Sequence, residues 1–213
     1  MNRHPSSLTQ WLDLMPLVAI LRGLEPERAA EYGFALSQAG LSIIEVPLNR
    51  PRALESIGAL AGVLGRYVLV GAGTVMNAAD VRAATDAGAR RIVSPSTDPA
   101  VIAETKRRGA FSMPGFFTAS EGFAALDAGA DGLKLFPAEA ASPAILKSLK
   151  TVLNAPILPV GGGEPAHFGA WMKAGAAGFG LGGALFKPEY SPEDVHDRAA
   201  AAVAAMRAVR EGS

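Results

Sequence analysis

The stretch Asp127-Ala128-Gly129-Ala130-Asp131-Gly132-Leu133-Lys134-Leu135-Phe136 carries two structural signals. Its Ala-Gly pair predicts the end of a helix, because glycine just past a helix readily adopts the left-handed conformation that closes the last turn. The alternation of apolar and other residues from Leu133 onward predicts a short strand. A helix followed directly by a strand is typical of a parallel αβ fold.

The same junction recurs along the chain. Ala-Gly or Arg-Gly also precedes an apolar run at Gly40, Gly88, Gly109 and Gly175. A proline or a capping residue follows each run and predicts the start of the next helix. These signals predict eight strands, near residues 17–21, 42–47, 67–72, 90–94, 110–114, 131–136, 156–161 and 177–182. Eight alternating βα units predict an α/β fold, a (β/α)8 TIM barrel, with a doubly wound open sheet as the alternative.

The composition limits the function classes. The 213 residues, 49% of them hydrophobic, predict one barrel domain over residues 1–213, with residues 1–15 forming an extra N-terminal helix across its bottom. The 20 Lys plus Arg balance 20 Asp plus Glu, so no nucleic-acid partner is expected. Apolar runs fall far short of the ~20 residues that span a bilayer, so no membrane partner is expected. The start lacks an export signal, and we expect a cytoplasmic location.

Lys134 is the first candidate for chemistry. Period-two alternation turns Leu133 and Leu135 toward the helices and Lys134 toward the inside of the barrel. Burial lowers the pKa of an amine and makes the neutral nucleophile available to attack a carbonyl group. The alternative is a lysine held in a structural ion pair.

Glu45 is the second candidate. Within Ile43-Ile44-Glu45-Val46-Pro47 the same alternation turns it inward. A carboxylate there is either a proton shuttle or the partner of a salt bridge, and the sequence leaves both open. Because an unpaired buried charge is costly, we expect Lys134 and Glu45 to lie together.

Two further candidates follow predicted strands. Arg22 ends the first, where its guanidinium could hold a carboxylate through two parallel hydrogen bonds; a solvated loop arginine is the alternative. Thr74 follows Gly71-Ala72-Gly73 and offers a hydroxyl donor beside exposed backbone.

Glycine-rich turns follow the seventh and eighth predicted strands. They contain Gly161, Gly162, Gly182 and Gly183. Bare amide groups after these two strands are the usual phosphate site of a TIM barrel, although two tight turns without a ligand remain the alternative. The histidines His4, His167 and His196 fall in the tail or on predicted helices, and no cluster has the spacing of metal ligands, so no metal is expected.

Several motifs occur together and in one order from about Pro16 to the final helix. They are Ala19-Ile20-Leu21-Arg22-Gly23, Ile44-Glu45-Val46, Gly71-Ala72-Gly73-Thr74-Val75, Ser94-Pro95, Met113-Pro114-Gly115 and Gly132-Leu133-Lys134-Leu135-Phe136-Pro137-Ala138. This set resembles the 2-keto-3-deoxy-6-phosphogluconate and 2-keto-3-deoxy-6-phosphogalactonate aldolases, which are class I enzymes on a (β/α)8 barrel.

The resemblance implies a role for each matched position. Lys134 would form a Schiff base with the substrate ketone, and Glu45 would move protons. The remaining positions would bind the substrate: Arg22 and Thr74 its carboxylate, Phe136 and Pro95 as pocket walls, and Gly161, Gly162, Gly182 and Gly183 its phosphate. The resemblance also implies pyruvate as a product, no cofactor, and a homotrimer.

Two positions distinguish the substrate type. Asn49 and Val160 stand where the gluconate-type enzymes usually carry arginine and threonine, and both resemble the galactonate type. This predicts cleavage of 2-keto-3-deoxy-6-phosphogalactonate to pyruvate and D-glyceraldehyde 3-phosphate. The gluconate epimer and 4-hydroxy-2-oxoglutarate are the alternative substrates.

Gly183 departs from the family pattern. The family often has a serine at or beside this position, whereas Gly182-Gly183-Ala184 offers only backbone. A keto-acid substrate without a phosphate group therefore remains an alternative. Beyond the family, a phosphate-binding barrel isomerase or synthase, and a non-catalytic barrel that binds metabolites, are the remaining alternatives.

Overall fold

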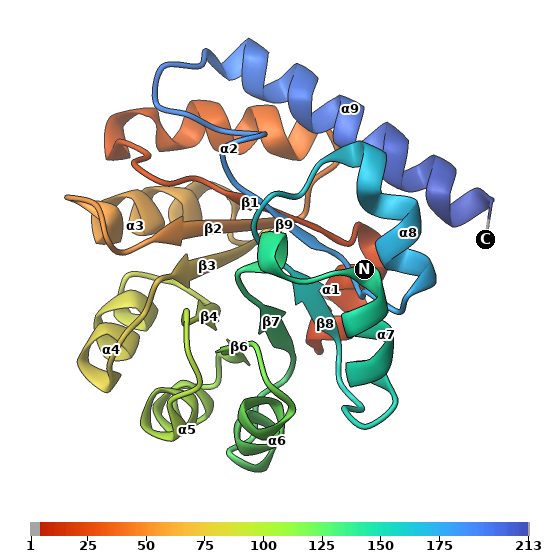
Figure 1. The fold of residues 1–213 in the computed structure, drawn as a ribbon. Coiled ribbons are helices and arrows are strands. Elements are labelled where there is room, and N and C mark those ends of the chain that lie inside the picture. The colour runs from red at the N-terminus through yellow and green to blue at the C-terminus, as the bar shows by residue number, and fades with distance from the viewer. Residues whose placement is uncertain (1–4, 213) are drawn as a thin grey trace.

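The computed structural model describes residues 5–212, and its short parallel strands lie inside a ring of helices (Figure 1). The strands of this part of the chain are β1 (Leu17–Ile20), β2 (Ile43–Pro47), β3 (Leu69–Gly73), β4 (Arg91–Val93), β5 (Phe111–Met113), β6 (Gly115–Phe116), β7 (Leu133–Leu135), β8 (Ile157–Pro159) and β9 (Phe179–Leu181). The helices are α1 (Leu8–Leu14), α2 (Ala29–Gln38), α3 (Ala53–Leu64), α4 (Ala78–Asp86), α5 (Pro99–Arg107), α6 (Ala119–Asp127), α7 (Pro143–Lys150), α8 (Phe168–Lys173) and α9 (Pro192–Glu211).

The strands pair in two parallel, curled sheets. One has the order β5-β4-β3-β2-β1-β9 and the other the order β6-β7-β8. The parallel α/β architecture predicted from the sequence is therefore confirmed, but the pairing does not form one continuous sheet of eight strands. The strand predicted near residues 110–114 is observed as β5 (Phe111–Met113). Pro114, which has no N–H group to donate to a neighbouring strand, separates it from β6, a strand that was not predicted. A single parallel bridge, Val160 to Gly180, links the end of β8 to β9.

Alternation along the strands separates two hydrophobic cores. The larger core lies between the strands and the helices and includes Leu17, Ile44 and Leu133. The smaller core lies on the inner face of the strands and consists of Leu8, Trp11, Leu12, Val18, Ile20, Ile43, Leu69, Val93, Met113 and Leu158. Because these inner residues come from both curled sheets, the two sheets enclose one interior.

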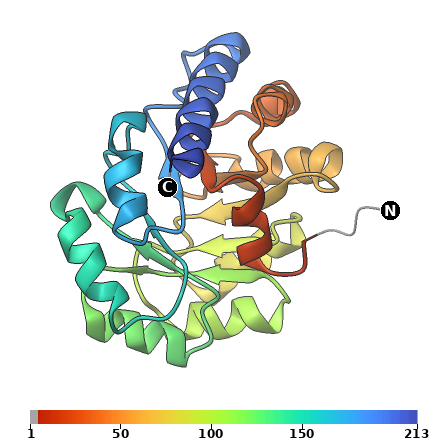
Figure 2. The ribbon, with the colours of Figure 1, turned by 90° about the vertical axis from the view of Figure 1, so that its right-hand side faces the viewer.

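Helix α1 closes one end of this interior. Leu8, Trp11 and Leu12 belong to the inner core, and the Ser7 hydroxyl caps the helix by accepting a hydrogen bond from the amide of Gln10. Figure 2 shows α1 beside one end of the strands. The extra helix predicted over residues 1–15 is thus observed over Leu8–Leu14, and residues 1–4, including His4, lie outside the described residues. In residues 5–212 no helix is both long and apolar enough to cross a membrane.

Candidate active site

Three charged side chains replace apolar ones on the inner face of the strands. They are Glu45 on β2, Arg91 on β4 and Lys134 on β7, with 3%, 2% and 7% of their surface exposed. Lys134 and Glu45 were predicted from the sequence, whereas Arg91 was missed. The signal was present, since Arg91 alternates with Ile92 and shares the inner face with Val93 of the inner core.

Lys134 is a buried amine on β7. Burial is the main cause that lowers its pKa; the Glu45 carboxylate opposes this effect, and the positive charges of Arg91 and Arg22 add to it. Its Nζ lies 4.4 Å from the centre of the Phe136 ring. Within residues 5–212 it forms no ion pair within 4.0 Å. The environment therefore favours the neutral, nucleophilic amine.

The ion pair of Glu45 is with Arg91. Arg91 Nη1 donates to Glu45 Oε2 at 3.0 Å, and both side chains are buried. This corrects the expectation that Lys134 and Glu45 would be each other's charge partners. Both line one cavity, but a carboxylate paired with a permanently charged guanidinium leaves the amine free of an ion pair.

The cavity opens at the carboxyl ends of the strands and has a volume of about 820 Å³. The predicted positions that line it are Arg22, Glu45, Asn49, Thr74, Pro95, Lys134, Phe136, Val160, Gly161, Gly162, Gly182 and Gly183. All twelve predicted site residues thus meet around one space. The other lining residues are Ile20, Arg50, Gly163, Glu164, Gly180, Ala184, Phe186, Lys187 and Pro188. Gly163 and Gly180 belong to the glycine-rich stretches that were predicted from the sequence, and the others were not predicted as site residues. Most of these adjoin predicted positions in the same loops.

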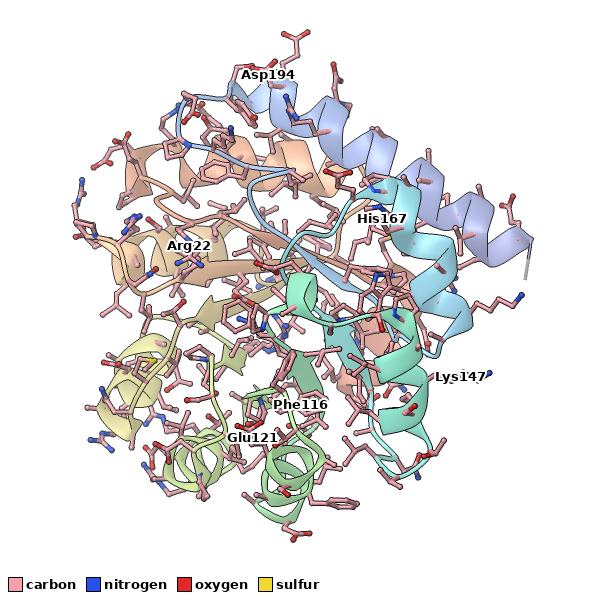
Figure 3. All side chains as sticks on the ribbon, in the orientation of Figure 1. Arg22, Phe116, Glu121, Lys147, His167 and Asp194 are labelled. Carbon is pink, nitrogen blue, oxygen red and sulfur yellow. The ribbon has the colours of Figure 1, made fainter. Side chains whose placement is uncertain are left out.

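Positive charge surrounds the mouth of the cavity. Arg22, Arg50 and Lys187 are exposed and line it, and Glu164 is the acidic residue among its exposed lining. Arg22 Nη1 donates to Asn49 Oδ1 at 2.5 Å, which fixes the guanidinium over the opening. This excess of cations favours an anionic ligand. Not every exposed cation lies at this mouth: Lys147, for example, points outward from α7 (Figure 3).

Thr74 occupies a strained backbone position at the cavity wall. Its φ is +56°, a left-handed conformation that β-branched residues rarely adopt and that costs ~1–3 kcal/mol. Flanking hydrogen bonds hold it there: Leu48 N donates to Gly73 O at 2.8 Å, and Val75 N donates to Val93 O at 3.1 Å. The strain fixes the direction of the Thr74 side chain.

The two glycine-rich turns differ in the space around them. Gly161 and Gly162 have φ values of +113° and +63°, and a Cβ at Gly161 would collide with the Glu139 carboxylate. At Gly182 and Gly183 a Cβ would meet nothing within 4 Å. Both turns present backbone to the cavity without covering side chains, which suits an anion such as phosphate.

The two described histidines lie away from this cavity. His167 is exposed before α8. His196 is half-buried on α9, where its Nδ1 lies 3.0 Å from Asp197 Oδ1. Between residues 5 and 212, no group of three or more His, Cys, Asp or Glu side chains is placed to hold a metal ion.

Known proteins share both the sequence and the arrangement. Residues 8–200 match the family of KDPG and KHG aldolases, named for 2-keto-3-deoxy-6-phosphogluconate and 2-keto-4-hydroxyglutarate. The chain belongs to this family. It is a family of class I aldolases, the class in which a lysine forms the Schiff base.

Two relatives of this aldolase chain cover nearly its whole length. A protein of Rhizobium meliloti named "Probable 2-dehydro-3-deoxy-6-phosphogalactonate aldolase" is 43% identical over 199 residues, which is 92% of this chain and 94% of the relative. The 2-dehydro-3-deoxy-6-phosphogalactonate aldolase of Escherichia coli K12 is 41% identical over 200 residues, which is 93% of this chain and 98% of the relative.

Solved aldolase structures have the same fold. A structure described as native KDPGal superposes with a TM-score of 0.90 at 40% identity, over 92% of this chain and 97% of that one. The KDPG aldolase of Zymomonas mobilis superposes with a TM-score of 0.83 at 28% identity, over 93% and 97% of the two chains.

Proposed function

We propose that the chain cleaves 2-dehydro-3-deoxy-6-phosphogalactonate, also called 2-keto-3-deoxy-6-phosphogalactonate, to pyruvate and D-glyceraldehyde 3-phosphate. The observation that carries this proposal is the buried Lys134 amine. Its pKa is lowered, and it lines the same cavity as the Glu45 carboxylate. The names of the two relatives support the choice of substrate.

The proposed reaction begins at Lys134. Its neutral Nζ attacks the C2 ketone, and loss of water from the carbinolamine gives an iminium ion. Glu45 then removes the proton of the C4 hydroxyl, the C3–C4 bond breaks, and its electron pair moves into the iminium to form an enamine. The aldehyde product leaves, and the proton returns to C3. Hydrolysis of the resulting imine releases pyruvate and restores the amine.

The rest of the cavity would bind the substrate. In this proposal Arg22 and Thr74 hold the carboxylate next to C2, and Pro95 and Phe136 form the walls. The turns at Gly161–Gly162 and Gly182–Gly183 hold the phosphate at the other end, near Lys187. Asn49 and Val160 face the substrate between these ends, and so would influence which C4 epimer is preferred.

The proposal extends to the whole molecule. We propose that the two curled sheets are arcs of one (β/α)8 barrel, since β5 and β6 are separated by Pro114 alone and a bridge joins Val160 to Gly180. We also propose a homotrimer in the cytoplasm, on the basis of the family resemblance. Sedimentation would test the trimer, and cell fractionation the location.

Turnover assays test the substrate directly. Pyruvate release should be measured with both C4 epimers of the phosphorylated substrate and with 4-hydroxy-2-oxoglutarate. We expect the highest kcat/KM with the galactonate epimer, and a Val160→Thr variant should narrow the preference by roughly tenfold, the effect of one hydrogen bond. A preference for the gluconate epimer would reassign the substrate, and no pyruvate from any of the three would refute the aldolase proposal.

A further inference from the structure

Arg91 is a buried charge that the proposed reaction does not use. It does not line the cavity, so it is not a substrate contact of this site. Its Nη1 donates to Glu45 Oε2 at 3.0 Å, while Nε and Nη2 point at Met113 Sδ at 3.3 and 3.1 Å. A thioether is a weak acceptor, so Glu45 is the partner that offsets the buried charge.

The strand register is built around this ion pair. Glu45 pairs with Gly71, and Gly71 pairs with Arg91, so the three residues lie side by side across β2, β3 and β4. Neighbouring strands lie ~4.8 Å apart, and the two long side chains meet across β3 because position 71 has no side chain. A Cβ at Gly71 would lie 2.9 Å from the Arg91 carbonyl oxygen.

Gly73 makes the matching space for Glu45. A Cβ at this position would overlap Glu45 Oε1, so the carboxylate occupies the space that the glycine leaves. Arg91 therefore holds Oε2, and Oε1 lies toward the carboxyl end of β3, on the side where the cavity opens.

The site contains two buried bases and one buried carboxylate. Burial lowers the pKa of Arg91, and the Glu45 carboxylate opposes this effect. A guanidinium nevertheless stays protonated far above neutral pH, so Arg91 takes the carboxylate. Lys134 has no ion-pair partner within 4.0 Å among the described residues, and it is the base that can lose its charge.

We propose that Arg91 is a positioning residue, which holds Glu45 through Oε2 and so keeps the carboxylate from pairing with Lys134. The role rests on the proposed function, because it matters to catalysis only if Lys134 is the nucleophile. The charged groups that act on Lys134 are Glu45 from β2, Arg91 from β4 and Arg22 after β1. Loss of Arg91 removes one cation and releases the carboxylate, and both changes favour protonated Lys134.

The test measures the protonation of Lys134 without any substrate. The rate at which acetic anhydride labels Lys134 is followed against pH by mass spectrometry, with exposed Lys147 as the internal reference. We expect Arg91→Met to move the Lys134 midpoint upward by about 1 pH unit or more. Arg91→Lys retains the charge and should restore most of the wild-type midpoint. Arg90→Met changes the exposed neighbour and should leave the midpoint unchanged.

A second pair of variants tests the same role if Arg91→Met does not fold. Glu45→Gln and the double variant Glu45→Gln/Arg91→Met both lack the Glu45 charge, so no carboxylate is left without its partner. The midpoint of the double variant should lie above that of Glu45→Gln. Circular dichroism confirms that each protein is folded.

Two results would overturn the role of Arg91. One is an unchanged Lys134 midpoint in Arg91→Met, or in the double variant relative to Glu45→Gln. The other is a shift in Arg91→Lys as large as that in Arg91→Met. Failure of the proposed function is a different result, since wild-type protein would then release no pyruvate whatever the labelling showed.

Discussion

At the scale of single residues, the site depends on how little water reaches one amine. Lys134 is 7% exposed, and its burial outweighs the attraction of Glu45, so its pKa is lowered. A lysine of ordinary pKa would be almost fully protonated at neutral pH and could not attack a carbonyl group. The same burial that supplies a nucleophile should therefore lower the stability of the fold.

A Lys134→Met variant tests this link between reactivity and stability. The unfolded lysine has its ordinary pKa near 10.5, and the folded one releases its proton at lower pH. Between these two values the unfolded chain binds more protons, so the wild-type free energy of unfolding rises with pH. We expect Lys134→Met to be more stable than wild type at neutral pH, and the difference to shrink as the pH approaches 10.5.

Urea denaturation at a series of pH values measures this difference. Lys147→Met, which changes an exposed lysine on α7, is the matched control and should show no such trend. If the free energies of unfolding of Lys134→Met and wild type differ by a constant amount over the whole pH range, the lowered pKa of Lys134 would be contradicted.

At the scale of elements, the loops after the strands determine what the cavity can hold. The turn after β9 offers backbone at Gly182 and Gly183, with open space where a side chain would extend. A hydroxyl added there could donate one more hydrogen bond to a bound phosphate without displacing its surroundings.

Gly183→Ser should therefore strengthen phosphate binding. We expect KM for the phosphorylated substrate to fall by roughly threefold to tenfold, which corresponds to one hydrogen bond. Cleavage of 4-hydroxy-2-oxoglutarate, which has no phosphate, is the control and should keep its KM. An equal change in KM for both substrates, or no change for either, would show that this turn does not bind the phosphate.

The elements also show what the sequence could and could not predict. The αβ junctions and the inward alternation at Lys134 follow from local rules that need no tertiary contact. Strand β6 was not predicted, because the pairing of Gly115 and Phe116 with β7 depends on tertiary contacts. Arg91 was missed because Arg90-Arg91 follows a helix end, where arginines are usually solvated. The Arg22–Asn49 hydrogen bond joins two loops whose conformations no local pattern determines.

At the scale of the whole molecule, the inner core and the cavity lie at opposite ends of the strands. The inner core and α1 fill the amino-terminal end of the strands, and the charged cavity lies at the carboxyl end. Trp11 is 1% exposed and is the largest side chain that α1 contributes to the inner core. The two ends share the strands but few side chains. A substitution in the inner core should therefore lower the stability of the fold without changing the chemistry of the cavity.

Trp11→Ala should destabilise the fold by about 3–5 kcal/mol, because it leaves a large void in the inner core. The folded fraction should retain the wild-type kcat. Leu14→Ala changes a residue of the same helix that is 59% exposed, and it should alter the free energy of unfolding by less than about 0.5 kcal/mol. Equal effects of the two variants in chemical denaturation would show that α1 does not seal the interior.

Borohydride reduction of the protein in the presence of pyruvate, followed by peptide mapping, tests most directly whether Lys134 forms the Schiff base. A Schiff base becomes a stable secondary amine on reduction, so the modified lysine can be identified by mass. We expect one reduced pyruvate adduct, on Lys134, in the wild type and in Lys147→Met, and no adduct in Lys134→Met. An adduct on another lysine, or inactivation without any adduct, would contradict this expectation.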